Sequence, residues 1–168
     1  MKSILKLITV AFLTLAPLTV FAQSNVAHIN VQQLISEMPE VVAAQNELAK
    51  LEKDYTTQID NAFKEFQTKA QSYSADAANQ TDVTNQARQK ELESMQTNLQ
   101  EFRDSAAQEL QKKQMDLMTP LLEKARNAIT KVGKDQGFNY VIDSSPNGGL
   151  ILAEGKDLIE DVKRELGF

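Results

Sequence analysis

The chain has 168 residues, with 18 basic and 23 acidic side chains, one histidine and no cysteine. The lack of cysteine excludes disulfide bonds and a lipid-modified lipoprotein. The acidic balance, without any basic cluster, argues against nucleic-acid binding, because phosphate recognition needs concentrated Lys and Arg.

The N-terminus has the pattern of a secretory signal peptide. Lys2 and Lys6 precede or interrupt an apolar run over residues 5–20, which ends in Val20-Phe21-Ala22 before polar residues. The apolar run is about 16 residues long, shorter than the roughly 20 needed to cross a bilayer. We predict that residues 1–22 are a signal peptide cleaved after Ala22. Removal of its two lysines changes the formal charge from −5 to −7.

Two long helices follow. No glycine and no further proline occur between Pro39 and about residue 74, and Pro39 with Glu40 suits a helix start. Apolar side chains recur there every three or four residues, about 3.56 on average, which predicts a helix with little supercoil. The stripe is Val41, Ala44, Leu48, Leu51, Tyr55, Ile59, Ala62, Phe66, Ala70 and Tyr73.

The second stripe is thinner than the first. It is interrupted at Glu91 and Lys113, and Pro120 falls inside the helical pattern, where we expect a kink. Its members are Val83, Ala87, Met95, Leu99, Phe102, Ala106, Leu110, Leu117, Leu121, Ala125, Ala128 and Val132. The two stripes predict that one helix packs on the other.

The small, polar segment 74–82 between the helices predicts the tip of a hairpin, with Asp82 as the N-cap of the second helix. Arms of roughly 50 Å are longer than a core of this size requires. A two-helix hairpin buries only a narrow stripe, so the arm needs neighbours or stays mobile. Apolar residues off the stripe, such as Val42, Phe63, Leu92 and Met118, are available to another chain.

Both ends of the chain predict short strands. Residues 25–31 alternate partly between apolar and polar, Gly137 suits a helix C-terminus, and residues 138–143 form a second strand. The turn signal at 145–149 predicts a hairpin to a returning strand over 150–153, followed by a helix over 156–166. So small a sheet is marginal alone, and its open edges favour pairing with another copy.

The sequence therefore predicts a mostly α fold with a small β body. Residues 39–119 form a long antiparallel helical hairpin, and residues 23–38 and 120–168 form the α/β oligomerisation body from which it projects. The residues expected to assemble the oligomer through the sheet are Val26, Ile29, Val141, Ile142, Leu150, Ile151 and Leu152.

No pattern of catalytic or cofactor-binding residues is evident. His28, the single histidine, has no cysteine or second histidine with which to bind zinc, and no nucleophile motif accompanies it. Gly148-Gly149 lies in a turn signal rather than in a phosphate-binding loop. Carboxylates such as Glu91 and Glu109 alternate with Lys and Arg, as on a solvated helix face. We therefore predict no enzyme activity, no metal and no cofactor.

The order of several motifs resembles the Skp/OmpH family of periplasmic chaperones. A strand at 27–30 precedes Leu34 and Met38-Pro39-Glu40, which opens the first long helix, and residues 109–122 carry the motif of the second. The ending from Gly137 to Val162 also fits, so the resemblance covers nearly the whole secreted chain.

The resemblance implies a homotrimer held by a small β body, with helical arms that enclose a cavity. It implies an ATP-independent holdase that binds unfolded outer-membrane proteins in the periplasm. The expected client-binding residues on the arm are Phe63, Phe66, Tyr73, Met95 and Phe102. The acidic charge disfavours contact with lipopolysaccharide or anionic lipid, in contrast to strongly basic members of the family.

Two other function classes fit the sequence less well. One is a structural or adaptor hairpin of the cell envelope that binds one folded partner. The other is an enzyme whose site is completed in the oligomer, for which the residues offer little chemistry.

Overall fold

The structure is a computed structural model that describes residues 25–146 and 148–168, so the predicted signal peptide lies outside the described residues. The chain is mostly helical with a small sheet, as predicted. Its strands are β1 (Val26–Ile29), β2 (Tyr140–Asp143) and β3 (Lys156–Asp157). Its helices are α2 (Val31–Glu37), α3 (Pro39–Asp76), α4 (Asp82–Asp135) and α5 (Ile159–Leu166), with a short 3-10 helix η1 (Ala77–Asn79).

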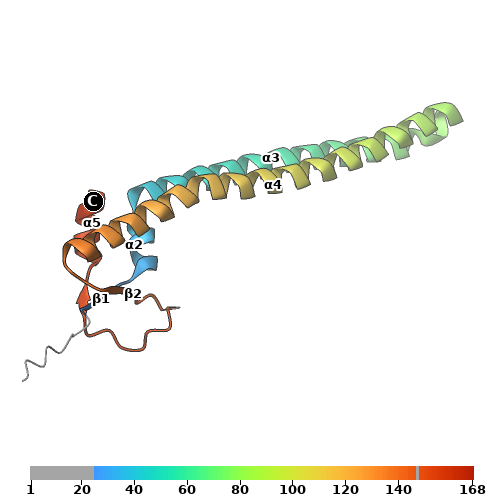
Figure 1. Cartoon of the computed structure of the whole chain (residues 1–168). Helices are drawn as coiled ribbons and strands as arrows, with labels where there is room; N and C mark the ends of the chain where they lie inside the picture. The colour runs from blue at the N-terminus through green and yellow to red at the C-terminus, as the bar shows by residue number, and fades with distance from the viewer. Residues whose placement is uncertain (1–24, 147) are drawn as a thin grey trace, which may run out of the picture.

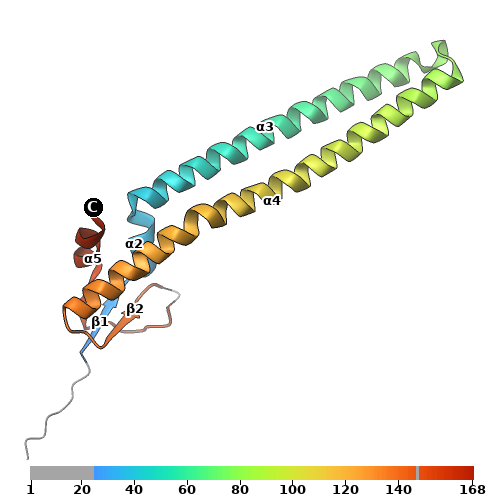
Figure 2. The same ribbon diagram turned by 45° about the horizontal axis from the view of Figure 1, so that its top comes forward.

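The helices α3 and α4 lie side by side and extend far beyond the sheet (Figures 1 and 2). At about 1.5 Å per residue, α3 is roughly 57 Å long and α4 roughly 81 Å. Pro39 occupies the first turn of α3, where its missing N–H costs nothing, and Glu40 adds a negative charge at the same end. The helix α4 continues through Pro120 without a break. We call residues 39–119 the arm and the remaining described residues the body.

The periodic stripe of α3 is the face that packs on α4. Val41 and Ala44 are buried and the other eight members are half-buried, as the spacing predicted. In α4, the stripe is buried or half-buried from Met95 to Val132, but Val83 and Ala87 near the tip are exposed. Packing in the outer part of the arm therefore depends little on apolar burial.

The cap of α4 is Thr81 rather than the predicted Asp82. The Thr81 hydroxyl accepts a hydrogen bond from the Thr84 backbone N–H at 3.2 Å, and Asp82 lies in the first turn. Both residue types suit the N-cap position. Thr81 occupies it because its backbone is extended, whereas Asp82 is already part of the helix. At the other end of α4, Gly137 has a φ of +75° and terminates the helix, as predicted.

The sheet has the order β2-β1-β3, and both outer strands are parallel to β1. The predicted hairpin between 138–143 and 150–153 is therefore wrong. Leu150–Ala153 forms no strand, and the third strand is Lys156–Asp157, which the sequence analysis had placed at the start of the last helix. That helix, α5, begins three residues later, at Ile159. Parallel pairing with β1 brings both chain ends together, a long-range constraint that local turn signals do not contain.

The core of the body joins residues of β1, α2, α3, α4 and α5, and Val141 of β2 packs against it. It consists of Ala27, Ile29, Leu34, Met38, Val41, Ala125, Ala128, Val132, Leu158, Ile159 and Val162. Gly133 lets α4 approach β2, because a Cβ there would lie 2.8 Å from the Val141 Cγ2 atom. The sheet thus rests on the base of α4.

The sheet has one face on this core and one face open. Ala27 and Ile29 are buried on the inner face, whereas Val26 on the opposite face is in register with Tyr140, and His28 with Ile142. Tyr140 is 62% exposed and Ile142 40%. Parallel sheets usually have both faces covered, so we call Val26, Tyr140 and Ile142 the outer sheet face and treat it as a candidate contact surface.

The body core predicts a clear difference between two truncations. Leu34 is fully buried, so Leu34→Ala should lower the free energy of unfolding by about 2–5 kcal/mol. Val83→Ala shortens the side chain of a residue that is 77% exposed, so this change should alter the free energy of unfolding by less than about 0.5 kcal/mol. Urea unfolding followed by circular dichroism at equal protein concentration measures both. Equal shifts of the two midpoints would contradict this account of the core.

Candidate functional site

The five side chains predicted to bind clients lie along the arm, but only Phe63 projects clearly from it. Phe63 is 40% exposed, whereas Phe66, Tyr73, Met95 and Phe102 are half-buried in the contact between α3 and α4. Other apolar side chains that the prediction did not include are more accessible, among them Val42, Val83 and Met115. The exposure of these residues depends on how each helix is rotated about its own axis toward its partner. The presence of apolar residues in the sequence does not fix this rotation.

Phe63 and Phe66 form an aromatic pair on the arm. Their rings stack with centroids 6.5 Å apart and an interplanar angle of 23°. They line a shallow groove of about 490 Å³ with Leu99 and the aliphatic parts of polar residues on α4, including Arg103. The groove offers an apolar floor with a polar rim.

Phe102 is held by a neighbour on α3. The rings of Tyr55 and Phe102 meet edge to face with centroids 6.0 Å apart. A hydrogen bond from the Tyr55 hydroxyl to Glu109 raises the pKa of Tyr55 above its usual range. Phe102 therefore stabilises the pairing of the two helices as well as offering apolar surface.

The tip of the arm is held together by a polar network around Tyr73. Its hydroxyl donates to Glu91 at 2.6 Å, and the Lys69 ammonium donates to the same carboxylate at 2.5 Å. The Arg88 guanidinium lies 4.7 Å from the centre of the Tyr73 ring and 3.1 Å from an Asp76 oxygen. These polar contacts join α3 and α4 where few apolar side chains are buried.

The network shifts the pKa of both its carboxylates in one direction. Hydrogen bonds from Lys69 and then Tyr73 hold the pKa of Glu91 below its usual range, and the bond from Arg88 does the same for Asp76. Each carboxylate is therefore stabilised in its charged form by the paired arm.

The polar interruptions of the second stripe are cross-arm ion pairs. Glu91 pairs with Lys69, and Lys113 pairs with Glu47 at 2.7 Å. Nearer the body, Lys124 pairs with Glu40 at 2.6 Å. The interruptions are visible in the sequence, but their partners are not, because the pairing depends on the register of the two helices.

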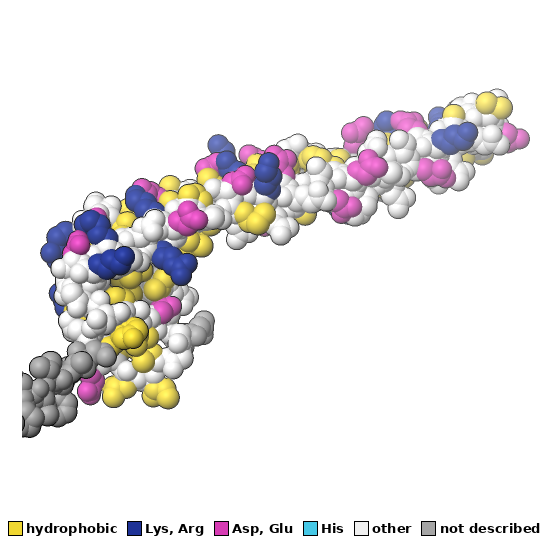
Figure 3. Space-filling model, in the orientation of Figure 1, with side chains coloured by type: hydrophobic (Ala, Val, Ile, Leu, Met, Phe, Trp, Pro, Cys, Tyr) yellow, Lys and Arg dark blue, Asp and Glu magenta, His cyan; other side chains and the backbone are white. Residues whose placement is uncertain are grey.

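The residues predicted to assemble the oligomer divide into three locations. Val26 and Ile142 lie on the outer sheet face, while Ile29 is buried in the core and Val141 is half-buried beside it. The segment Leu150–Leu152 lies in the connection between β2 and β3, where Ile151 is fully exposed and Leu152 is 69% exposed. Figure 3 shows hydrophobic side chains gathered over the body, whereas those along the arm are interspersed with charges of both signs.

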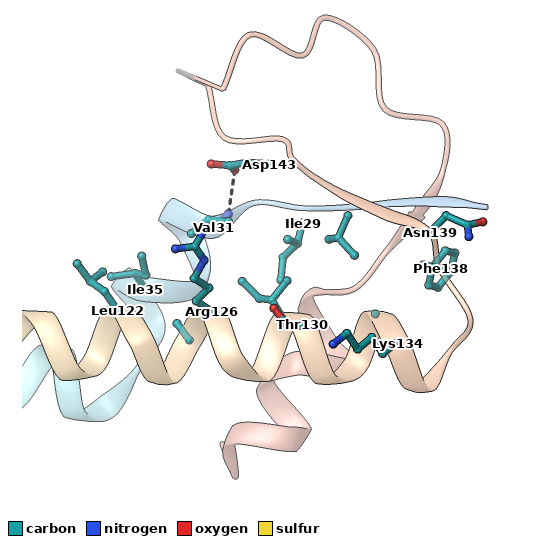
Figure 4. Close-up of a pocket in the computed structure, with 14 residues that line it drawn as sticks. Ile29, Val31, Ile35, Leu122, Arg126, Thr130, Lys134, Phe138, Asn139 and Asp143 are labelled. Carbon is teal, nitrogen blue, oxygen red and sulfur yellow. Dashed lines mark hydrogen bonds between the residues drawn. The ribbon is translucent and has the colours of Figure 1, made fainter. Parts of the chain in front are cut away.

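A cleft opens between the inner side of the sheet, α2 and the base of α4 (Figure 4). It encloses about 580 Å³, and its apolar lining includes Ile35, Leu122, Ile129 and Phe138. Arg126 and Lys134 stand at its edge on α4. The Val31 backbone N–H donates to Asp143 at 3.3 Å on the opposite side. This apolar cleft with a basic edge was not foreseen from the sequence.

His28 has a structural place in the body. Its Nε2 atom lies 3.1 Å from the Gly155 carbonyl oxygen and its Nδ1 atom 3.3 Å from the Ser144 hydroxyl. It therefore bridges the two ends of the β2–β3 connection. Within residues 25–146 and 148–168, no group of acidic or histidine side chains is arranged to bind a metal. In the same part of the chain, no helix is both long and apolar enough to span a bilayer.

The fold places the chain among proteins that present a long pair of helices from a small α/β body. The family model described as Outer membrane protein (OmpH-like) matches residues 25–166, and the chain belongs to this family. A curated relative, Chaperone protein Skp of Yersinia enterocolitica, is 24% identical over 148 residues, which cover 85% of this chain and 86% of the relative. The predicted family resemblance is confirmed.

The tip network predicts a pH-dependent opening of the arm. The pKa of Glu91 and of Asp76 is lower in the paired arm than in the open one, so the two charged carboxylates stabilise the paired arm. This stabilisation is complete at pH values above the ordinary carboxylate pKa range, and it is lost as the pH falls through the lowered pKa values. The chain has no cysteine, so spin labels at Gln71→Cys and Gln89→Cys report only the separation of the helices near the tip. We expect a narrow distance distribution at pH 7 that broadens below about pH 4.

Glu91→Gln provides the control for this experiment. It removes the charge shared by Lys69 and Tyr73, so the distribution should be broad at pH 7 and respond much less to acid. A narrow distribution in the variant at pH 7 would show that the network does not hold the tip closed.

Proposed function

We propose that this protein is an ATP-independent holdase chaperone that binds unfolded outer-membrane proteins in the periplasm and prevents their aggregation. Membership of the OmpH-like family and the relative named as a chaperone support this assignment. The apolar N-terminal segment supports export through a signal peptide cleaved after Ala22. The acidic charge of the chain disfavours lipid or lipopolysaccharide as a partner.

The observation that carries the proposal is the distribution of apolar side chains on the arm. They are half-exposed, spaced along two helices and separated by charged residues, with the Phe63–Phe66 groove as the largest group. A folded partner binds best to one contiguous apolar patch, whereas an unfolded chain can contact many separate sites. Each large side chain contributes only about 1.5–3 kcal/mol when fully buried, so holding depends on several contacts together.

Assembly through the body supplies the remaining part of the proposal. The outer sheet face exposes Val26, Tyr140 and Ile142, and the edge of β2 has no partner strand within the described chain. We propose a homo-oligomer, a trimer by family resemblance, joined by residues 23–38 and 120–168. The arms, residues 39–119, then project side by side and enclose a client between them.

The tip network supports a second candidate function, an envelope adaptor that binds one folded partner. Polar contacts among Lys69, Tyr73, Arg88 and Glu91 hold the two helices of the tip together, so the tip has one fixed shape to which a folded partner can fit. An adaptor binds its native partner with fixed stoichiometry and is indifferent to unfolded clients. The aggregation experiment below separates the two functions.

Client holding should fall in steps as aromatic side chains are removed from the arm. Phe63→Ala or Phe66→Ala alone should weaken protection modestly, because each leaves most contacts in place. Replacement of Phe63, Phe66, Tyr73, Met95 and Phe102 together should abolish protection. The measurement is light scattering of a urea-unfolded β-barrel protein diluted into each variant at equal oligomer concentration.

The matched control is Gln58→Ala with Gln71→Ala, which truncates two exposed polar residues of the same helix. It should protect as well as the parent. Circular dichroism and sedimentation must show that the fivefold variant keeps its helices and its assembly, since Tyr73 and Phe102 also join α3 to α4. A single substitution that removes all protection, or a fivefold variant that retains it, would contradict distributed holding.

A further inference from the structure

The connection between β2 and β3 is fixed at both ends and unpacked in its middle. At its start, Ser145 is only 6% exposed, and its hydroxyl donates a hydrogen bond to the Asp143 carboxylate at 2.6 Å. At its end, the Gly155 carbonyl oxygen lies 3.1 Å from His28, and Lys156 pairs with Asp161 at 2.8 Å. Between these anchors, Ile151 and Leu152 project into solvent. The anchors hold an apolar loop away from its own body.

The cleft between the sheet and α4 is complementary to this loop in apolar surface and in charge. Its floor is apolar, and Leu122 within it is 44% exposed. Arg126 and Lys134 at its edge form no ion pair with any carboxylate in residues 25–146 and 148–168, although their neighbours Lys124 and Lys131 do. Glu154, which follows the apolar segment of the loop, is also without an ion pair in those ranges. Loop and cleft thus match in both apolarity and charge.

A chain cannot readily fill its own cleft with its own loop. Figure 4 shows the connection on the side of the strands that faces away from α4, whereas the cleft lies on the α4 side. The sheet, centred on β1, separates the two surfaces. A neighbouring copy has no such obstruction.

We propose that the cleft binds the Leu150–Glu154 loop of a second copy of this chain, with Ile151 and Leu152 on the apolar floor and Glu154 beside Lys134 and Arg126. The inference rests on the oligomer proposed above and identifies its contact. One loop and one cleft on each chain make the contact heterologous, so successive copies join head to tail, and they form a ring when the rotation between copies closes. This geometry accounts for a cyclic assembly without a symmetric two-fold interface.

Disulfide trapping tests the contact directly, because the natural chain has no cysteine. Ile151→Cys and Leu122→Cys chains are co-refolded and mildly oxidised, and disulfide-linked dimers should form in high yield. The control pairs Ile151→Cys with Gln96→Cys, an exposed site on the arm, and should give little product. Both substitutions in one chain should produce covalent multimers up to a closed ring without free thiols. A yield no greater than that of the control would overturn the proposal.

Charge reversal gives a second, independent measurement. Glu154→Lys or Lys134→Glu should raise the dissociation constant of the oligomer by roughly tenfold or more in sedimentation, because each places like charges together. The two changes in one chain should restore assembly toward that of the parent. Both residues are exposed, so circular dichroism should show unchanged helicity. Failure of the double variant to regain assembly would count against the proposed pairing.

The outcomes also separate this inference from the proposed function. If the protein remains oligomeric and protects unfolded clients, yet Ile151→Cys and Leu122→Cys do not cross-link, the loop contact is wrong and the chaperone proposal stands. If Leu122→Cys cross-links to a client with a single cysteine instead of to Ile151→Cys, the cleft is a client site and the inference fails. A parent protein that is monomeric while it protects clients would refute the proposed assembly and this contact together.

Discussion

Two helices that pack only on each other bury one narrow stripe of side chains, and the arm formed by α3 and α4 is built on such a stripe. Within residues 39–119, Val41 and Ala44 at the base and Leu99 and Ala106 further out are buried, but the remaining stripe residues keep part of their surface in water. Toward the tip, ion pairs and hydrogen bonds replace apolar burial. Exposed ion pairs add little stability each. The arm therefore stays extended while its apolar side chains remain partly available for other contacts.

The topology explains how so long an arm is attached to so small a body. Since β1 and β2 are parallel neighbours, the chain must return to the same end of the sheet between them, and the whole of α2, α3 and α4 forms that connection. Both long helices are fixed in one core, through Val41 on α3 and Val132 on α4. The body consequently folds only when the two ends of the chain meet.

The helices could be predicted from local sequence features, whereas the pairing of distant strands and helices could not. Pro39 and Gly137 mark helix ends because each has a backbone preference that acts within one turn. The α3 stripe was correct to the residue because helical spacing fixes which face is buried. The strand at 150–153 was wrong, although its turn signal and β-branched residue favoured a hairpin. The real third strand, Lys156–Asp157, has no strand signal of its own and exists because β1 has a free edge. The partners of Glu91 and Lys113 were missed for the same reason, since they depend on the register between helices rather than on spacing within one.

A parallel sheet with one open face and an apolar cleft beside it is an incomplete body, and in the proposed function this incompleteness links assembly to client holding. In a single chain, the outer sheet face, the cleft and the loop around Ile151 all remain in water. In the proposed oligomer, contacts between copies would remove this surface from water and stabilise each chain by mass action, so stability should rise with protein concentration. The same contacts would set the arms side by side, with their scattered apolar side chains facing a common space. Weak contacts with a client would then act together, because the assembly holds each arm at a high effective concentration relative to the others. An arm detached from the body would keep its surface but lose this advantage.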